Sequence, residues 1–171
     1  MDVIEAIQKR RSIRKYTMQE VSDDIVKTLL DCARAAANAG GRQPWAFVVV
    51  RSTETKTALA EAASKQAFIA TAPVVIVVCA DPDRSGERYE DRGRTLYAFQ
   101  DTASAVTNMM LAAVSLGLGT CWIGAFKESE VKRILDLPGN LKPVAMLPVG
   151  YPDQERPPRL LRPESEVVFF K

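Results

Sequence analysis

The chain of 171 residues contains no histidine and only three cysteines. The absence of histidine excludes Ser-His-Asp triads, Cys-His pairs, HExxH zinc sites and histidine-ligated haem. Any enzyme chemistry must therefore use another acid, a nucleophile without imidazole, or a bound cofactor. Cys32, Cys79 and Cys121 lie far apart without a CxxC pair, and their odd number favours a reducing compartment, so we expect a cytoplasmic protein.

Long apolar runs and an excess of one charge are also missing. No run approaches the roughly 20 residues that span a bilayer, and the first residues lack the cationic-then-apolar order of a signal peptide. The formal charge is +2, and most basic residues alternate with acidic ones, unlike a nucleic-acid-binding surface. A P-loop is absent, and Gly117-x-Gly119 lacks the third glycine of a dinucleotide site. We therefore expect neither a membrane nor a nucleic acid as partner.

The size and the 47% of apolar residues are sufficient for an ordinary core, and we expect a single domain over residues 1–171. Helical spacing of apolar residues behind capping residues predicts helices from Asp2, from Ser22 to the Gly40-Gly41 pair, and from Thr53 to about Gln66. Other segments are predicted as a buried helix at 96–116, a short helix near 131–135, a mobile charged loop at 81–95, and strands at 44–50, 73–80, 144–150 and 167–170.

These elements do not alternate strictly between strand and helix, which predicts an α+β fold with a mixed central β-sheet covered by helices on both faces. The uninterrupted apolar segment 44–50 should lie deep in that sheet, because both of its faces would be covered. Pro148 indicates a bulge or an edge strand. The helix at 96–116 is apolar on nearly all sides, so it should be buried and could form an oligomer interface.

The stretch from Lys9 to Tyr16 has five cations, one hydroxyl and one aromatic ring in eight positions. Such positive charge at the end of a helix could simply stabilise the helix C-terminus. A phosphate, however, needs guanidinium groups for its charge and a hydroxyl for a remaining oxygen. Arg10, Ser12 and Arg14 alternate, so an extended backbone would direct all three toward one anion.

The residues Arg10-Arg11-Ser12-Ile13-Arg14 resemble the R-R-S-x-R signature of the FMN-dependent nitroreductase family. Three later segments resemble that family's motifs in the same order. Residues 35–45 resemble A-P-S-x-x-N-x-Q-P-W, residues 117–124 resemble G-L-G-[ST]-C-W-[IL]-G, and residues 159–163 resemble K-x-R-R-P. The four motifs together extend over nearly the whole chain.

The resemblance implies that Arg10, Ser12, Arg14, Arg159 and Arg162 hold the phosphate and ribityl end of FMN, and that Gln43, Gln66 and Gly124 lie near the ring. Gln66 could equally be an ordinary surface glutamine. The chain departs from the family pattern at Ala37, Asn38, Gly41 and Leu161, so Asn38 would have to supply the side-chain interaction that Gly41 cannot make. No metal is expected, and the flavin rather than a side chain carries the chemistry. The complete set of implied cofactor-binding residues is Arg10, Arg11, Ser12, Arg14, Ala37, Asn38, Gln43, Gln66, Ile123, Gly124, Ala125, Arg159 and Arg162.

The implied activity is hydride transfer from NAD(P)H to flavin N5 and onward to a nitroaromatic, a quinone or a similar small acceptor. The implied assembly is a homodimer built around the long helix, in which residues 167–170 add a strand to the partner's sheet. Two alternatives stay open. One is a flavin-binding sensor or storage dimer without turnover, because the short segment 81–95 leaves little material for a lid over the substrate. The other is a relative that performs dehalogenation or breaks down flavin.

Overall fold

A four-stranded sheet forms the centre of the computed structural model, which describes residues 1–155 and 158–171. Arg156 and Pro157, inside the proline-rich stretch, lie outside the described residues. The strand order is β1 (Trp45–Val50), β2 (Val74–Ala80), β4 (Lys142–Gly150) and β3 (Gly119–Thr120). All three strand pairs are antiparallel, so the expectation of a mixed sheet was wrong. The chain leaves β1 at Val50 and enters β2 at the same end of the sheet, where Val50 pairs with Val75.

The two long apolar segments differ in burial. All seven residues of β2 are buried, as predicted for a strand covered on both faces. The prediction that 44–50 lies deep in the sheet was wrong, because β1 is an edge strand and most of its residues are only half-buried. Val49 keeps 39% of its surface exposed. One edge of β1 is therefore open to another chain or to solvent.

Pro148 lies inside the inner strand β4, paired with Val75, so its assignment to an edge or a bulge was wrong. The register shift occurs elsewhere, between Val78 and Cys79. On the β3 side, Pro148 lies between the Thr120–Val149 pair and the isolated bridge from Ile123 to Met146. Because proline has no N–H to donate, the β3–β4 ladder is interrupted at this position.

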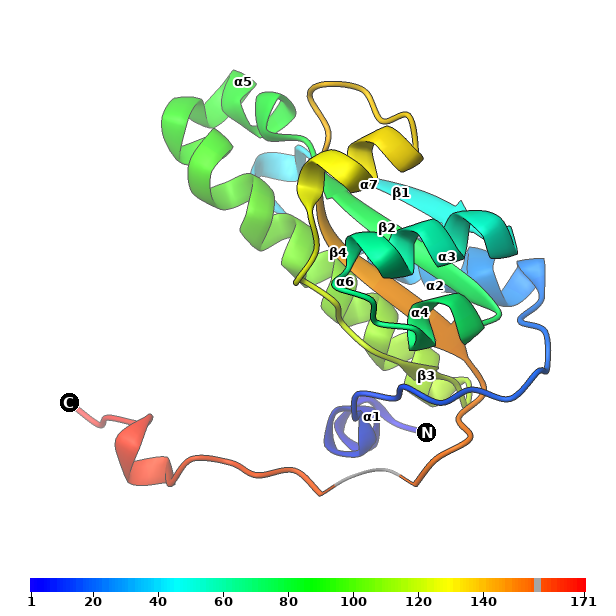
Figure 1. The fold of residues 1–171 in the computed structure, drawn as a ribbon. Helices are drawn as coiled ribbons and strands as arrows, with labels where there is room; N and C mark the ends of the chain where they lie inside the picture. The colour runs from blue at the N-terminus through cyan, green and yellow to red at the C-terminus, as the bar shows by residue number, and fades with distance from the viewer. Residues whose placement is uncertain (156–157) are drawn as a thin grey trace.

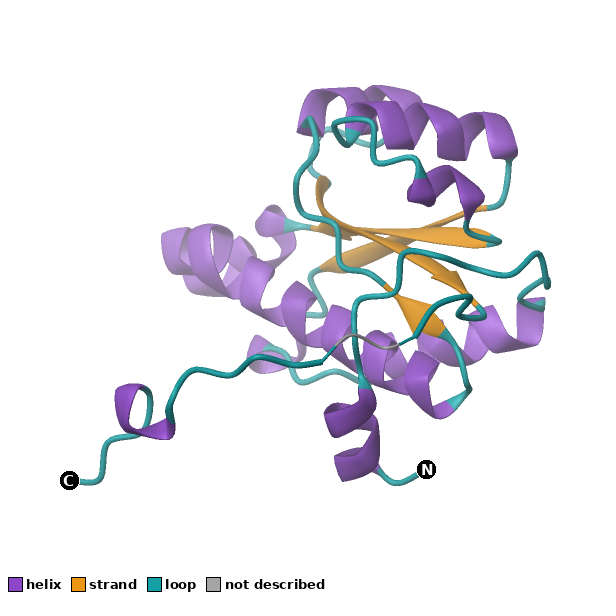
Figure 2. Ribbon diagram, turned by 60° about the horizontal axis from the view of Figure 1, so that its bottom comes forward, coloured by secondary structure: helices purple, strands orange, loops and turns teal. Residues whose placement is uncertain are grey.

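Helices cover both faces of the sheet, as predicted (Figures 1 and 2). α2 (Asp23–Arg34) and α6 (Ala98–Ser115) share one buried core with β2 and β4. α3 (Thr53–Ala62), α4 (Phe68–Thr71) and α7 (Glu128–Ile134) form a second core on the other face. The short helix α1 (Val3–Lys9) packs against α6. This arrangement confirms the α+β class.

Two helices end earlier than the apolar spacing predicted. α2 stops at Arg34, and residues Ala39–Gly41 form a separate 3-10 turn, η1. α3 stops at Ala62 because Ser64 and Lys65 adopt φ values of 58° and 61°, in the left-handed region that ends a helix. Gln66 therefore lies in the turn before α4 rather than in the third helix.

The segment predicted as a mobile loop at 81–95 is largely helical, so that prediction was wrong. α5 spans Pro82–Arg92 and continues through a π-helix, η2 (Gly93–Tyr97), into α6. Its start has ordinary helix signals that the charged composition obscured. The Asp81 side chain accepts a hydrogen bond from the Arg84 N–H at 3.2 Å, and Pro82 occupies the first turn.

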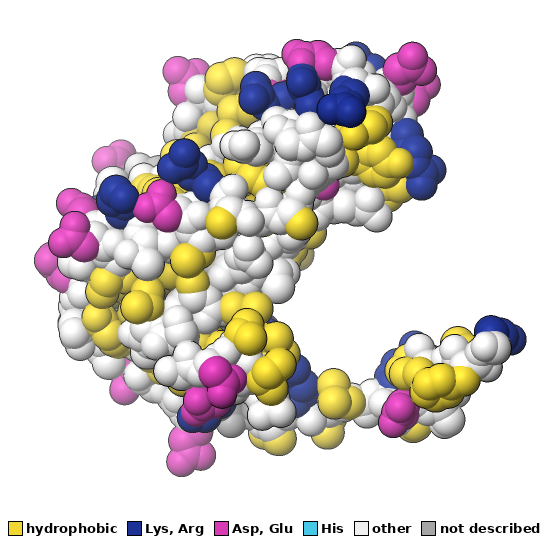
Figure 3. Space-filling model, turned by 180° about the vertical axis from the view of Figure 1, so that it is seen from behind, with side chains coloured by type: hydrophobic (Ala, Val, Ile, Leu, Met, Phe, Trp, Pro, Cys, Tyr) yellow, Lys and Arg dark blue, Asp and Glu magenta, His cyan; other side chains and the backbone are white. Residues whose placement is uncertain are grey.

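Residues 158–171 extend away from the body (Figure 1), and the space-filling view shows a hollow between this segment and the body (Figure 3). The regular structure described in this segment is a 3-10 turn, η3 (Glu164–Glu166). Residues 167–170 are exposed and form no strand within one chain, so the predicted strand has no partner here. No helix of the described chain is long and apolar enough to cross a membrane.

Candidate functional site

The basic stretch begins where α1 ends, with Arg10 as its C-terminal capping residue. The Arg11 guanidinium donates to the carbonyl oxygens of Gln8 at 2.6 Å and of Arg10 at 2.8 Å. These carbonyls lie at the end of the helix, where a cation is favourable. Arg11 thus stabilises the C-terminus of α1, as positive charge at the end of a helix does.

Residues 12–17 run as an extended segment between β3 and the chain that follows β4. The Ile13 N–H donates to the Thr120 carbonyl at 2.9 Å, beside a parallel bridge between Ser12 and Thr120. On the other side, the Gln154 Oε1 accepts the N–H groups of Arg14 and Lys15 at 2.8 and 2.9 Å. The predicted extended backbone is therefore present, and both neighbours hold it in place.

Gly119 permits this close approach of two distant parts of the chain. A Cβ atom at Gly119 would come within 2.7 Å of the Ile13 side chain, which is buried. No side chain larger than hydrogen fits there without displacing Ile13. Gly119 of the G-L-G motif thus lets Ile13 pack closely, and Ile13 in turn fixes the positions of its sequence neighbours Ser12 and Arg14.

Cations from the two ends of the chain meet at Arg10. The Arg159 guanidinium donates to the carbonyls of Ile7 at 3.0 Å and Arg10 at 2.9 Å. Burial, followed by the nearby charges of Arg159 and Arg11, lowers the pKa of Arg10. None of the ion pairs among the described residues involves Arg10, Arg14 or Arg159. This positive charge lacks a carboxylate partner, as an anion-binding site requires.

Arg162 does not join this cluster. Its Nε lies 3.1 Å from a carboxylate oxygen of Glu166, within the C-terminal segment, and the guanidinium is largely exposed. The structure therefore places one of the two predicted C-terminal arginines, Arg159, beside the basic stretch.

The buried Cys121 thiol lies next to the basic stretch, because Thr120 forms a parallel bridge with Ser12. Burial raises the pKa of Cys121, and the nearby Arg14, Ser12 and Arg10 act in the opposite direction.

A second part of the predicted site adjoins Arg14. Its guanidinium carbon lies 5.9 Å from the centroid of the Phe68 ring at the start of α4. The nearby Gln66 Nε2 donates to the carbonyls of Ala63 at 2.9 Å and Ala125 at 3.4 Å. Gln66 is thus held against the 123–125 segment, where Ile123 is buried on β4 and Gly124 and Ala125 are exposed.

The predicted loop residues Ala37, Asn38 and Gln43 lie at another place. Asn38 shapes the loop itself, because its Oδ1 accepts the Gln43 N–H at 2.9 Å and its Nδ2 donates to Ala36 at 3.1 Å. The loop rests on α6, where the Asp101 Oδ2 accepts the Ala39 N–H at 3.1 Å. Burial raises the pKa of Asp101, and the hydrogen bond from Ala39 partly opposes this shift.

Opposite ends of α6 carry these two groups of residues (Figure 1). Asp101, beneath the loop, lies in the first turns of α6, whereas α1 and α6 enclose a cavity of about 410 Å³ lined by Asn108 and Ser115. At about 1.5 Å per residue, these positions are roughly 10 to 20 Å apart along the helix axis. Within one chain, Ala37, Asn38 and Gln43 are therefore not brought together with Arg10, Ser12 and Arg159.

Two contacts that hold the site were not predicted from the sequence, those of Gln154 and Asp101. Gln154, which holds the basic stretch, lies in a polar segment with no motif that would single it out. Asp101 was detectable in principle, because a carboxylate in an otherwise apolar stretch of helix requires a partner. Its partner is the loop N–H of Ala39.

Comparison with known proteins identifies the family of the chain. Residues 7–69 and 62–151 match the model of the nitroreductase family. A Methanothermobacter thermautotrophicus protein named as an NADH dehydrogenase/NAD(P)H nitroreductase is 37% identical over 156 residues, which cover 89% of this chain and 78% of the relative. A Vibrio harveyi NADPH-flavin oxidoreductase is 33% identical over 93% of this chain and 70% of its own length.

Solved structures show the same fold. The structure of B. megaterium NfrA2 superimposes with a TM-score of 0.91 at 34% identity, covering 99% of this chain and 74% of that one. The chain therefore belongs to the nitroreductase family.

Proposed function

We propose that this chain transfers hydride equivalents from NAD(P)H to a nitroaromatic, a quinone or a similar small acceptor through bound FMN. The chain is an NAD(P)H-dependent oxidoreductase of the nitroreductase family, whose relatives include proteins named NADPH-flavin oxidoreductase and FMN reductase. The observation that supports FMN most strongly is the convergence of Arg10 and Arg159, two cations from opposite ends of the chain that form no ion pair among the described residues.

The side chains around Arg10 fit the phosphate and ribityl end of FMN. Arg10, Arg14 and Arg159 supply guanidinium donors for a phosphate, and Ser12 supplies a hydroxyl. Because Arg10 is partly buried, its charge is less screened by water and acts more strongly on a bound anion. The contribution of FMN, when bound, is to carry the hydride between the nicotinamide and the acceptor.

The surface beside Gln66 suits the flat ring of the cofactor. Gly124 is exposed, and a Cβ there would meet nothing closer than the Trp122 ring nitrogen at 3.8 Å. The amide of Gln66 is held by two carbonyls through its Nε2, which leaves its Oε1 able to accept a hydrogen bond. Gln66 and the Gly124-Ala125 backbone would orient the ring against Phe68 and Arg14.

A homodimer would complete this site. The second copy would supply Ala37, Asn38 and Gln43, which one chain holds at the far end of α6. Residues 167–170 of one copy would pair with the open edge of β1 in the other. A groove of about 420 Å³ at that edge is lined by apolar side chains that could receive them, including Val48, Val49, Ile134 and Leu135.

Enzyme turnover fits the structure better than a sensor or storage role. The sensor hypothesis rested on a short loop at 81–95, and that segment is instead α5 and η2, packed against the loop at 38–43. Dehalogenation and flavin breakdown remain outcomes that product analysis distinguishes. Cys32, Cys79 and Cys121 are free thiols, which fits the proposed cytoplasmic location.

The proposal is tested by titrating purified protein, reconstituted with FMN, with NADH and with NADPH under anaerobic conditions. We expect the flavin absorbance to bleach and to return when a quinone or nitroaromatic is added. Protein that takes up no FMN, or whose flavin is not reduced by either nucleotide, would refute the proposal. Consumption of the flavin itself after aerobic reduction would identify the flavin-breakdown alternative.

A further inference from the structure

Two arginines and two tyrosines form a compact group on α5 and η2, which we call the α5 cluster: Arg88, Tyr89, Arg92 and Tyr97. The tyrosine rings meet edge to face, with centroids 5.2 Å apart. The guanidinium carbon of Arg88 lies 5.5 Å from the Tyr89 ring centroid, and that of Arg92 lies 5.3 Å from the Tyr97 centroid. The Arg92 Nε also donates to the Tyr97 hydroxyl at 2.9 Å. These contacts fix both guanidinium groups beside aromatic rings.

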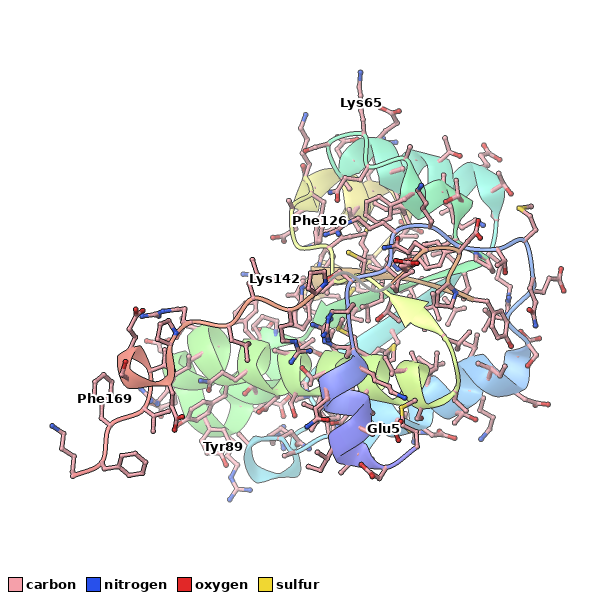
Figure 4. The ribbon with its side chains drawn as sticks, turned by 90° about the horizontal axis from the view of Figure 1, so that it is seen from below. Glu5, Lys65, Tyr89, Phe126, Lys142 and Phe169 are labelled. Carbon is pink, nitrogen blue, oxygen red and sulfur yellow. The ribbon has the colours of Figure 1, made fainter. Side chains whose placement is uncertain are left out.

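The α5 cluster contacts the loop at 38–43 that we assign to the flavin site. The Arg88 Nη1 points to the Gly40 carbonyl at 3.5 Å, and a Cβ atom at Gly40 would collide with the Tyr89 hydroxyl. Gly40 has a φ of 57°, so both its backbone shape and its lack of a side chain suit this contact. Figure 4 shows Tyr89 on the side of the molecule opposite Lys65. A substrate that approaches the loop would therefore meet these side chains.

The charges of the α5 cluster are not neutralised by ion pairs. The acidic residues Asp83 and Glu87 of α5 pair with Arg94 and Arg42, and none of the ion pairs among the described residues involves Arg88 or Arg92. The Nη atoms of Arg92 and the Nη2 atom of Arg88 have no hydrogen-bond partner among the described residues. Lys and Arg side chains also gather at the end of the molecule that carries α5 (Figure 3).

The backbone of this region departs from a regular helix at the point where the cluster is assembled. Glu90 interrupts α5 with φ 48° and ψ −134°, and η2 follows as a π-helix. These irregularities bring Arg92 and Tyr97, five residues apart, into hydrogen-bond contact. Strained residues and π-helical turns cost stability and occur frequently at functional sites.

We propose that the α5 cluster binds the 2′-phosphate and adenine of NADPH, so that the enzyme prefers NADPH over NADH. This inference rests on the proposed function, because it concerns the nucleotide that delivers the hydride. The 2′-phosphate is a dianion that guanidinium groups bind with charge-assisted hydrogen bonds, and the adenine ring can stack on a tyrosine ring. NADH has a neutral hydroxyl at the 2′ position, so it lacks the charge-assisted contacts with Arg88 and Arg92.

The test compares steady-state kinetics of FMN-loaded wild-type enzyme with Arg88→Gln, Arg92→Gln and the double variant. We expect KM for NADPH to rise on the order of tenfold for each single variant, while KM for NADH stays the same. Arg133→Gln is the matched control, because Arg133 pairs with Glu130 on α7, on the opposite face of the sheet. This control should leave both KM values unchanged.

A binding measurement on the wild-type enzyme keeps the proposal testable even if a variant folds poorly. Adenosine 2′,5′-bisphosphate should compete with NADPH far better than adenosine 5′-monophosphate does, and Arg92→Gln should remove that difference. Equal inhibition by both nucleotides, a wild-type preference for NADH, or parallel changes in both KM values would overturn the proposal. A protein that oxidises neither nucleotide despite bound FMN would instead refute the proposed function.

Discussion

The two ends of α6 are built in different ways. At the α1 end, the backbone N–H groups of the basic stretch donate to acceptors far away in sequence, from Ile13 to the Thr120 carbonyl and from Arg14 to the Gln154 side chain. Within the α5 cluster, the contacts are between side chains close in sequence, such as Arg92 with Tyr97. A framework of long-range backbone bonds fixes where an anion can bind, whereas short-range side-chain contacts can vary while the fold is kept. The first end suits a constant cofactor and the second suits a selected substrate.

Removing residues 158–171 should have the largest effect on this comparison. The deletion takes away Arg159 from the α1 end and the residues proposed to pair with β1 of the partner. We expect the protein to become a monomer, lighter than the 18.8 kDa full chain by the deleted residues. We also expect its affinity for FMN to fall on the order of a hundredfold. Light scattering and fluorescence titration measure both. A deleted protein that stays dimeric and keeps FMN would contradict the strand exchange.

Arg10→Gln should weaken FMN binding by about 1.5 to 3 kcal/mol, because it removes a charge-assisted contact from a partly buried position. Arg162→Gln is the matched comparison, since that guanidinium is exposed and pairs with Glu166 in the C-terminal segment. We expect a much smaller change for it. Equal losses in a flavin fluorescence titration would mean that charge at either place acts only through the overall field.

Gly119→Ala tests the backbone framework of the α1 end. Its new methyl group would crowd the buried Ile13 side chain at 2.7 Å, and overpacking of this kind costs about 1 to 3 kcal/mol. Urea denaturation should show this loss, together with weaker FMN binding as Ser12 shifts. Gly139→Ala is the control, because a Cβ there has nothing within 4 Å. Unchanged stability of Gly119→Ala would show that Ile13 can move freely.

The same contrast explains which features could be predicted from the sequence. The motifs around Arg10 and Arg159 were informative because a phosphate demands particular residue types, and the motif around Gly119 was informative because only a small residue permits close approach. Two of these places, Arg10 and Arg159, are in contact. The sequence could not locate Arg162, because its pairing with Glu166 is a local choice of an exposed side chain.

The errors in the fold have local causes as well. The segment 81–95 is rich in charge, but Asp81 and Pro82 start a helix there, in which Asp83 pairs with Arg94 of η2 and Glu87 pairs with Arg42. The end of α3 depended on the left-handed Ser64, which apolar periodicity does not register. The edge position of β1 follows from topology, and composition alone did not distinguish it from β2.

Asp101→Asn, at the α5 end of α6, should change the stability of the protein least. The sign of the change follows from the pKa of Asp101. Burial raises the pKa of Asp101 above its unfolded value. Its contribution to stability is therefore fully present below the unfolded pKa, near pH 4, and is lost as the pH rises through the folded pKa. Asparagine carries no ionisation cost and can still accept the Ala39 N–H through its Oδ1.

We therefore expect Asp101→Asn to be more stable relative to wild type at pH 7 than at about pH 4, as a larger free energy of unfolding. The Asp101 Oδ1 is not a fully buried atom that lacks a partner. An amide nitrogen at this position can therefore be hydrated. Asp101→Ala is the control, because it leaves the Ala39 N–H without its acceptor and should destabilise the loop at both pH values. Urea titrations that show no change with pH, or the opposite change, would mean that Asp101 stays well hydrated, and that the loop is held by Asn38 rather than by α6.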